Sequence, residues 1–254
     1  MYLPKAIAGL RDATLAMLYP TACRVCGAMI ESWRDGVACA KCWEEVQQTR
    51  WPEDFCTKCG LPLQPLPSQV QIEKRRCGRC DEMAFNYARA CGPYEGALRE
   101  SVLWLKTHPQ ISQRMRELLI ATFFASPELQ ASESIIPVPL HPGRLAERTF
   151  NQAEIIAYAL SSASGLRVDT ASLARVKKTE MHRAGMGARE RARTLEKAFH
   201  LRAPRLIENR VVLVVDDVMT TSRTAQEIAQ TLIKGGASVV NVLTLARAVS
   251  MLVQ

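Results

Sequence analysis

The 254-residue sequence contains no apolar run that approaches the ~20 residues needed for a membrane-spanning helix. Its first twenty residues also lack the pattern of an export signal, because Arg11 and Asp12 interrupt the apolar stretch and no A-x-A-type cleavage site follows. Pro20 occupies the position where a lipoprotein anchor at Cys23 would require an aliphatic residue. We therefore expect a cytoplasmic protein without a membrane span.

Aromatic residues are scarce at 6% of the chain, which argues against an extended array of base-stacking side chains. Histidine occurs only four times and never among the N-terminal cysteines. Apolar residues make up 48% and charged residues 23%, as is ordinary for a globular protein. The length is sufficient for one full domain and a smaller one.

Eight of the nine cysteines form four Cys-x2-Cys pairs. They are Cys23, Cys26, Cys39, Cys42, Cys56, Cys59, Cys77 and Cys80. Two such pairs can surround one zinc ion with four thiolates, so four pairs predict two structural zinc ions. Disulfides are the alternative, but they require an oxidising compartment. The first two pairs could bind one ion and the last two the other, or the pairing could be crossed. The spacing alone leaves both arrangements open.

After residue 85 the sequence alternates between strand and helix patterns. We predict strands over 85–94, 134–140, 210–215 and 237–246, and helices over 95–108, 113–125, 151–165 and 222–236. This alternation predicts an α/β fold with a parallel sheet and helices on both faces. The predicted domains are an N-terminal helix (1–20), a double zinc ribbon (21–84) and the α/β domain (85–254).

The most informative segment is VVLVVDDVMTTSRT at 211–224. Five apolar residues predict a buried strand that ends at Asp216 and Asp217, where ligands of parallel sheets bind. A helix begins near Ser222, and its N-terminal amides favour a phosphate. A sugar phosphate would satisfy both features, since carboxylates bind hydroxyls while the turn holds the phosphate. The alternative is that the two acids only cap the next helix.

Positive charge is concentrated in one segment. The chain has a net charge of +8, and residues 175–210 hold eleven Lys or Arg against four Glu, a net charge of +7. Within this segment we expect nucleic acid to be contacted by Arg183, Arg189, Arg191 and Arg193. Such a segment attracts phosphorylated metabolites or nucleic acid.

Several motifs resemble known families. Residues 211–224 resemble the ribose 5-phosphate loop of type I phosphoribosyltransferases. Residues 136–152 (IPVPLHPGRLAERTFNQ), residues 94–106 and the cysteine pairs are similar to segments of the competence protein F family, in the same order. The resemblance covers nearly the whole chain and implies a phosphoribosyltransferase-like domain behind a double zinc ribbon.

The resemblance also implies roles for individual residues. Asp216 and Asp217 would contact the ribose of phosphoribosyl pyrophosphate (PRPP), which is normally bound with Mg²⁺. The 5-phosphate would lie on Thr220, Thr221, Ser222, Arg223 and Thr224. The pyrophosphate would face the loop after the strand at 135–138, with Arg144, Arg148, Asn151 and Gln152, together with Lys106. The chain departs from the family pattern at two glycine positions, where it has Ser222 and Thr149.

These features lead to a prediction of function and one alternative. We expect a competence-type protein that binds single-stranded DNA during DNA uptake or handling, through a PRPP-binding domain and with other competence or DNA-processing proteins as further partners. The alternative is an enzyme that transfers ribose 5-phosphate from PRPP to a nucleobase-like acceptor.

Overall fold

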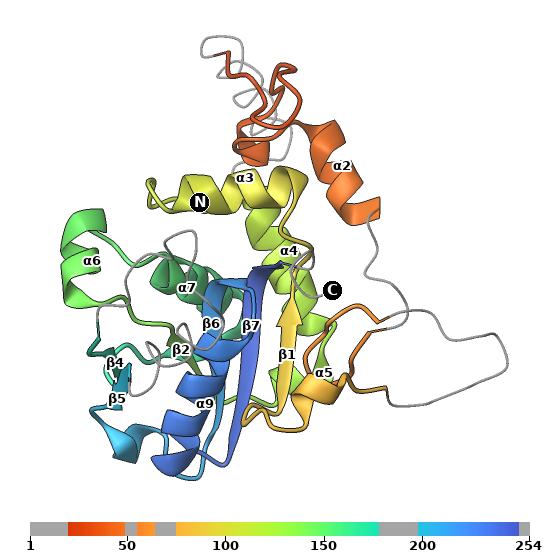
Figure 1. The fold of residues 1–254 in the computed structure, drawn as a ribbon. Helices are drawn as coiled ribbons and strands as arrows, with labels where there is room; N and C mark the ends of the chain where they lie inside the picture. Colours follow the sequence, from red (N-terminus) through yellow and green to blue (C-terminus); the bar gives the residue numbers. More distant parts are fainter. Residues whose placement is uncertain (1–19, 49–54, 64–74, 178–197, 249–254) are drawn as a thin grey trace, which may run out of the picture.

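The computed structural model describes residues 20–48, 55–63, 75–177 and 198–248 (Figure 1). The predicted helix over 1–20 and the residues Arg183, Arg189, Arg191 and Arg193 therefore lie outside the described residues, apart from Pro20. None of the helices in the described ranges has the length and apolar character required to cross a membrane.

A parallel sheet of five strands forms the centre of the α/β domain, in the order β1-β7-β6-β2-β3. The strands are β1 (Tyr87–Ala90), β2 (Ser134–Pro137), β3 (Arg167–Val168), β6 (Val211–Met219) and β7 (Val239–Arg247). The long central strands β6 and β7 are apolar and almost continuously buried, as expected for strands covered on both faces.

Helices cover both faces of this sheet. One face carries α3 (Gly96–Leu105), α4 (Gln113–Phe124), α5 (Pro127–Gln130) and α7 (Gln152–Ser164), and the other carries α9 (Arg223–Lys234). The alternation of side chains along β6 explains this division, because Leu213 and Val215 join the first core while Val212 and Val214 join the second. The predicted α/β architecture is confirmed.

The structure corrects two predictions around the proposed ligand site. Strand β6 does not end at Asp216 but continues to Met219, because β7 pairs with it from Val211 to Met219. Residues 142–148 are not a loop but form helix α6 (Pro142–Arg148), with His141 as N-cap and Pro142 in the first turn, where proline costs no hydrogen bond.

A small hairpin, not expected from the sequence, lies beside the sheet. It consists of β4 (Leu173–Arg175) and β5 (Phe199–Leu201), which pair antiparallel and are followed by the short helix η3 (Pro204–Leu206). The cysteine region contributes three short helical elements, namely η1 (Trp33–Asp35), α2 (Ala40–Gln48) and η2 (Gly78–Cys80).

The two halves of the cysteine region dock on different cores of the α/β domain. Cys23, Cys39, Cys42 and Trp43 belong to the core that contains α3 and α4, whereas Cys56, Cys59 and Cys80 belong to the core that contains α9. The cysteine region is therefore packed into the α/β domain at two separate places.

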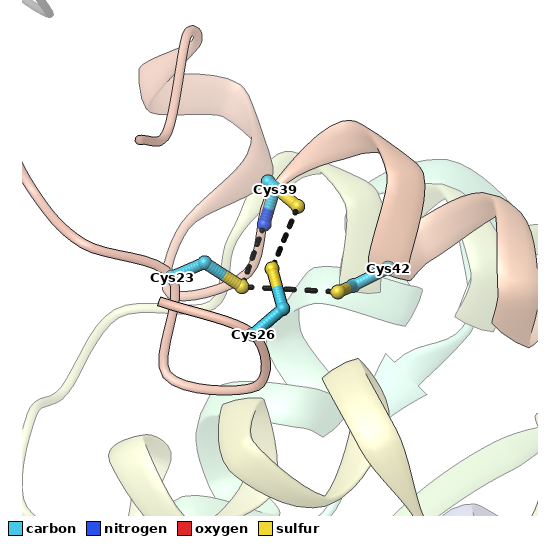
Figure 2. Close-up of side chains that lie close together, drawn as sticks. All are labelled: Cys23, Cys26, Cys39 and Cys42. Carbon is cyan, nitrogen blue, oxygen red and sulfur yellow. Dashed lines mark hydrogen bonds between the residues drawn. The ribbon is translucent and has the colours of Figure 1, made fainter. Parts of the chain in front are cut away.

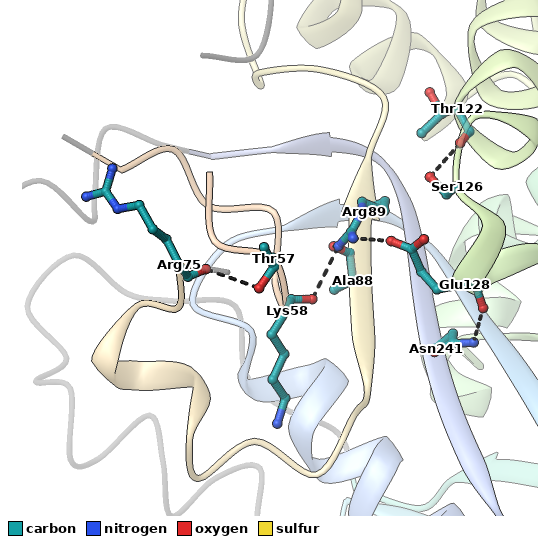
Figure 3. A network of polar contacts seen from close by, with 9 residues as sticks. All are labelled: Thr57, Lys58, Arg75, Ala88, Arg89, Thr122, Ser126, Glu128 and Asn241. Atoms are coloured by element: carbon teal, nitrogen blue, oxygen red, sulfur yellow. Dashed lines mark hydrogen bonds and ion pairs between the residues drawn. The ribbon is translucent and has the colours of Figure 1, made fainter. Parts of the chain in front are cut away.

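Polar contacts fix each docking. In the first half, Arg114 Nε on α4 donates to the buried carboxylate of Asp35 at 2.8 Å, and the Arg24 guanidinium lies 4.4 Å from the centre of the Trp104 ring. In the second, Figure 3 shows that the Arg89 side chain donates to the Lys58 carbonyl and forms an ion pair with Glu128, while Thr57 donates to the Arg75 carbonyl. The Lys58 carbonyl also accepts the Ala88 amide of β1 at 2.7 Å.

Candidate functional site

The cysteines form two groups of four, in sequence order. The first cysteine group contains Cys23, Cys26, Cys39 and Cys42, and the second contains Cys56, Cys59, Cys77 and Cys80. Within each group all four sulfur atoms lie within 4.8 Å of one another. Figure 2 shows the four sulfurs of the first group directed toward a common centre. The structure thus decides between the two pairings that the spacing left open.

The geometry of both groups fits zinc. Four thiolates at the usual Zn–S distance of about 2.3 Å in a tetrahedron are separated by about 3.8 Å. The sulfur–sulfur separations are 3.9 Å for Cys23–Cys42, 3.7 Å for Cys26–Cys39, 3.6 Å for Cys56–Cys80 and 3.7 Å for Cys59–Cys77, and Cys77–Cys80 is shorter at 3.3 Å. All nine cysteines are free thiols. The two groups are closed four-sulfur sites, which suit a structural ion and not a catalytic one.

The second candidate site lies where β6 meets α9. Asp216 and Asp217 are neighbours on an extended strand, so their side chains point to opposite faces of the sheet. Asp216 lines a hollow on the α9 side, and Asp217 contacts residues of α3 and α7 on the other side. The Asp216 carboxylate accepts the Asp217 amide at 2.8 Å, and that of Asp217 accepts the Val218 amide at 2.7 Å.

The hollow on the α9 side has a volume of about 30 Å³, more than the ~10–15 Å³ that one water molecule requires. Its polar lining comes from Asp216, Thr220, Ser222, Arg223 and Thr224, with Thr244 from β7. Within the described ranges, the amides of Thr220, Thr221 and Ser222 donate to no protein acceptor. The 220–224 turn therefore offers hydrogen-bond donors beside an open space.

Ser222 gives this turn its shape. It is the N-cap of α9 with φ 62° and ψ 4°, a left-handed conformation that glycine adopts more easily. Its side chain is buried, and its carbonyl accepts the Gln226 amide at 2.9 Å.

Three of the predicted site residues meet on the α7 side. Gln152 Nε2 lies 3.4 Å and Lys106 Nζ 3.9 Å from Asp217 Oδ2. Gln152 is the first residue of α7 and is buried, and its Oε1 has no partner in the described part of the chain. Arg148, at the end of α6, has a lowered pKa through burial and the nearby charge of Arg144, which the charge of Asp217 partly offsets.

Asn151 has a structural role. It is the N-cap of α7, where its Oδ1 accepts the Ala153 amide at 3.0 Å, and its Nδ2 donates to the Val138 carbonyl at 3.1 Å. These bonds hold α7 against the end of β2. Asn151 therefore positions its neighbour Gln152, and its own polar atoms are already used by the protein.

Asp216 stands in an unusual electrostatic environment. Burial and the neighbouring charge of Asp217 raise its pKa well above the usual range for a carboxyl group. Arg175 on β4 opposes this effect. In the sequence, Arg175 is only one of the basic residues of 175–210, because its place near Asp216 depends on the pairing of β4 with β5, which no local pattern predicts. Perturbed carboxylates of this kind gather at functional sites.

Comparison with known proteins gives three findings. Residues 14–81 match the double zinc ribbon domain family. The chain is 30% identical over 237 residues to DNA utilization protein YhgH of Escherichia coli (strain K12), covering 90% of this chain and 97% of that protein. It is 29% identical over 234 residues to competence protein F of Haemophilus influenzae, covering 89% and 96%.

One solved structure is also similar. It is described as the structure of the allosteric regulatory enzyme of purine biosynthesis, with a TM-score of 0.33 and 16% identity. The likeness covers 53% of this chain and 27% of that one.

Proposed function

This chain belongs to the family of DNA utilization protein YhgH and competence protein F, and on this basis we propose that it acts in the uptake or utilization of DNA by binding single-stranded DNA. We propose further that its α/β domain is phosphoribosyltransferase-like and binds PRPP, with or without bound DNA. A double zinc ribbon holds the N-terminal part of the chain on this domain.

The observation that carries PRPP binding is the 220–224 turn beside Asp216. Its unused amides and the dipole of α9 favour the 5-phosphate, and the hydroxyls of Thr220 and Thr224 add donors. A neighbouring carboxylate would repel a bare phosphate. It is suited to a ligand whose phosphate is joined to a ribose, because carboxylates accept hydrogen bonds from hydroxyls.

The α7 side supports the pyrophosphate. Lys106 and Arg148 supply positive charge near Asp217 for the pyrophosphate, whereas the Oε1 of Gln152 is an acceptor and suits a ribose hydroxyl. Arginine forks bind phosphate oxygens in pairs. Asp217 is a hard oxygen donor of the type that Mg²⁺ prefers, so an ion bound there would neutralise charge between this acid and the diphosphate.

Isothermal titration with PRPP and Mg²⁺ tests this proposal. We expect binding in the wild-type protein and a loss of at least about tenfold in affinity for Asp217→Asn, the size of one lost charge-assisted contact. Asp81→Asn, an exposed carboxylate in the second half of the cysteine region, should bind like the wild type. No heat of binding at millimolar PRPP would overturn the proposal.

The same site supports a second candidate, a transferase. An acceptor would attack C1 of the ribose while pyrophosphate leaves, and the perturbed Asp216 is the type of group that takes part in such chemistry. Incubation with PRPP, Mg²⁺ and a panel of nucleobases tests it through the release of pyrophosphate. If the wild-type protein releases no more pyrophosphate than Asp217→Asn does, the transferase is excluded. The proposal that the chain binds PRPP would still stand.

The net charge supports DNA binding, since the chain carries +8 and the 175–210 segment +7. Because aromatic residues are few, phosphate contacts would dominate, and the affinity should depend strongly on salt. Between 50 and 200 mM salt, the affinity for a single-stranded oligonucleotide should fall by roughly 300-fold if about six phosphates are contacted. A constant affinity would exclude this mode of binding.

A further inference from the structure

A buried arginine lies between the second cysteine group and the 220–224 turn. Arg247 is the last residue of β7 and is only 2% exposed. Its backbone is fixed by the Gly92 carbonyl, which accepts its amide at 2.9 Å, and by the Tyr94 amide, which donates to its carbonyl at 2.8 Å. The side chain therefore starts from a rigid position.

The guanidinium of Arg247 faces the second cysteine group. Its Nη1 donates to the Cys59 carbonyl, and its Nη2 lies 3.7 Å from Cys59 Sγ. A buried cation needs a counter-charge, and no carboxylate of the described residues forms an ion pair with Arg247. A zinc ion with four thiolates has a net negative charge, which would supply the counter-charge.

The same guanidinium reaches the proposed ligand site. Nη2 also lies 3.5 Å from Ser222 Oγ, and Nη1 lies 3.9 Å from Met219 Sδ. Met219 and Ser222 stand at the two ends of the short connection between β6 and α9, and both line the hollow beside Asp216. One fork-shaped side chain thus touches a cysteine of the second group and the residue in the left-handed conformation.

We propose that Arg247 is a positioning residue that couples zinc in the second cysteine group to the conformation of the 220–224 turn. Zinc fixes Cys59, Cys59 fixes the guanidinium, and the guanidinium holds Ser222. Coupling between two binding sites is reciprocal, so a ligand on the turn should also retain zinc in the second group. The ligand part of this inference rests on the proposed function, whereas the zinc part does not.

Zinc release to a chromogenic chelator tests the zinc part. Groups that hydrogen-bond to metal ligands affect metal affinity by about 10–100-fold. Arg247→Met should therefore release the zinc ion of the second cysteine group about 10–100-fold faster than the wild type does. The control is Arg24→Met, which removes a cation next to the first cysteine group and should leave the second ion unchanged. If Arg247→Met releases both zinc ions at the wild-type rate, the proposal is wrong.

Hydrogen exchange tests the link to the turn without any ligand. The amides of 220–224 should exchange faster in Arg247→Met and in Cys59→Ala than in the wild type, but not in Cys26→Ala, which alters the first group. If Arg247→Met does not fold, Arg247→Lys keeps the buried cation without its fork, and the same comparisons apply to it. Unchanged exchange would contradict the coupling.

Addition of PRPP and Mg²⁺ separates the two proposals. Bound PRPP should slow the release of the second zinc ion in the wild type and have no such effect in the Arg247 variant. If PRPP binds by titration and zinc release does not change, the coupling is wrong and the proposed function stands. If PRPP does not bind at all, the proposed function fails, and the exchange experiment still decides the coupling.

Discussion

One residue with a strained backbone lines the candidate ligand site, and another ends helix α6. In the described ranges, three non-glycine residues have positive φ, namely Thr149 (66°), Asn209 (57°) and Ser222 (62°). Asparagine tolerates this conformation, whereas serine and threonine do so at a cost of about 1–2 kcal/mol. Thr149 and Ser222 occupy the positions where the resemblance leads one to expect glycine. Strain of this kind persists mainly where the surrounding structure or a function requires it.

Replacement of Ser222 by glycine should relieve this strain. We expect Ser222→Gly to raise the free energy of unfolding by about 0.5 kcal/mol, since the relief of about 1–2 kcal/mol exceeds the added chain entropy of glycine and the loss of the 3.5 Å contact with Arg247. Denaturant unfolding measures the change. The control is Asn209→Gly, which should gain less because asparagine already accepts a positive φ. If Ser222→Gly instead lowers the free energy of unfolding, as glycine does at an unstrained position, this explanation is wrong.

Asp216 should make stability depend on pH. Its pKa is raised in the folded chain, so the folded state holds more protons than the unfolded state, and stability falls as pH rises from the unfolded pKa of about 3.9 through the folded one. Asp216→Asn cannot ionise. We expect this variant to be about 1 kcal/mol more stable than the wild type near neutral pH, a usual gain when site strain is relieved.

Thermal unfolding across a pH series measures this difference. The stability advantage of Asp216→Asn should shrink as pH falls through the folded pKa, because the wild-type carboxyl then becomes neutral as well. An advantage that stays constant with pH would show that the charge of Asp216 is not its cause.

At the scale of elements, the two cysteine groups act as separate attachments. The first docks through α2 on the core that contains α3, and the second docks on β1 and the core that contains α9. The cysteine region buries few apolar residues other than its cysteines, so metal binding is expected to supply much of its folding free energy.

The sequence-order grouping predicts how zinc is lost. Cys42→Ala should leave one of the two zinc ions, held by the second group, and Cys80→Ala should leave the other, held by the first. Metal analysis of the purified variants measures the stoichiometry, with Cys91→Ala, a buried cysteine outside both groups, as the control. Loss of both ions from either single variant would indicate that the two sites are not independent.

At the scale of the whole molecule, the proposed ligand site and the basic segment carry opposite local charge. Asp216 and Asp217 are adjacent acids in the C-terminal half of β6, whereas the net charge of the chain is +8. Nucleic acid would therefore be attracted to the chain as a whole and not to the two acids. The two proposed binding activities should be separable by substitution.

Asp217→Asn tests this separation. Binding of a single-stranded oligonucleotide should be unchanged or slightly tighter, because one negative charge is removed, while PRPP binding is lost. Fluorescence anisotropy with labelled DNA, run beside the titration with PRPP, provides both measurements. Parallel loss of both activities would show that DNA and PRPP share the site.

The sequence by itself determined the features that depend on neighbours along the chain. Helices α7 and α9 end where Gly165 and Gly235 stop them, and the Cys-x2-Cys turns point paired thiolates at one ion, because these are contacts within a few residues. The run at 211–215 indicated the buried strand for the same reason.

Only the tertiary structure decided the features that depend on contacts between distant segments. β6 continues past its two acids because β7 is there to pair with it, and the cysteine pairs combine in sequence order because each half packs against a different core. The electrostatic interaction of Arg175 with Asp216, and the contacts of Arg247 with Cys59 and Ser222, join residues that no local pattern connects. Such contacts form only when the sheet brings the strand ends together.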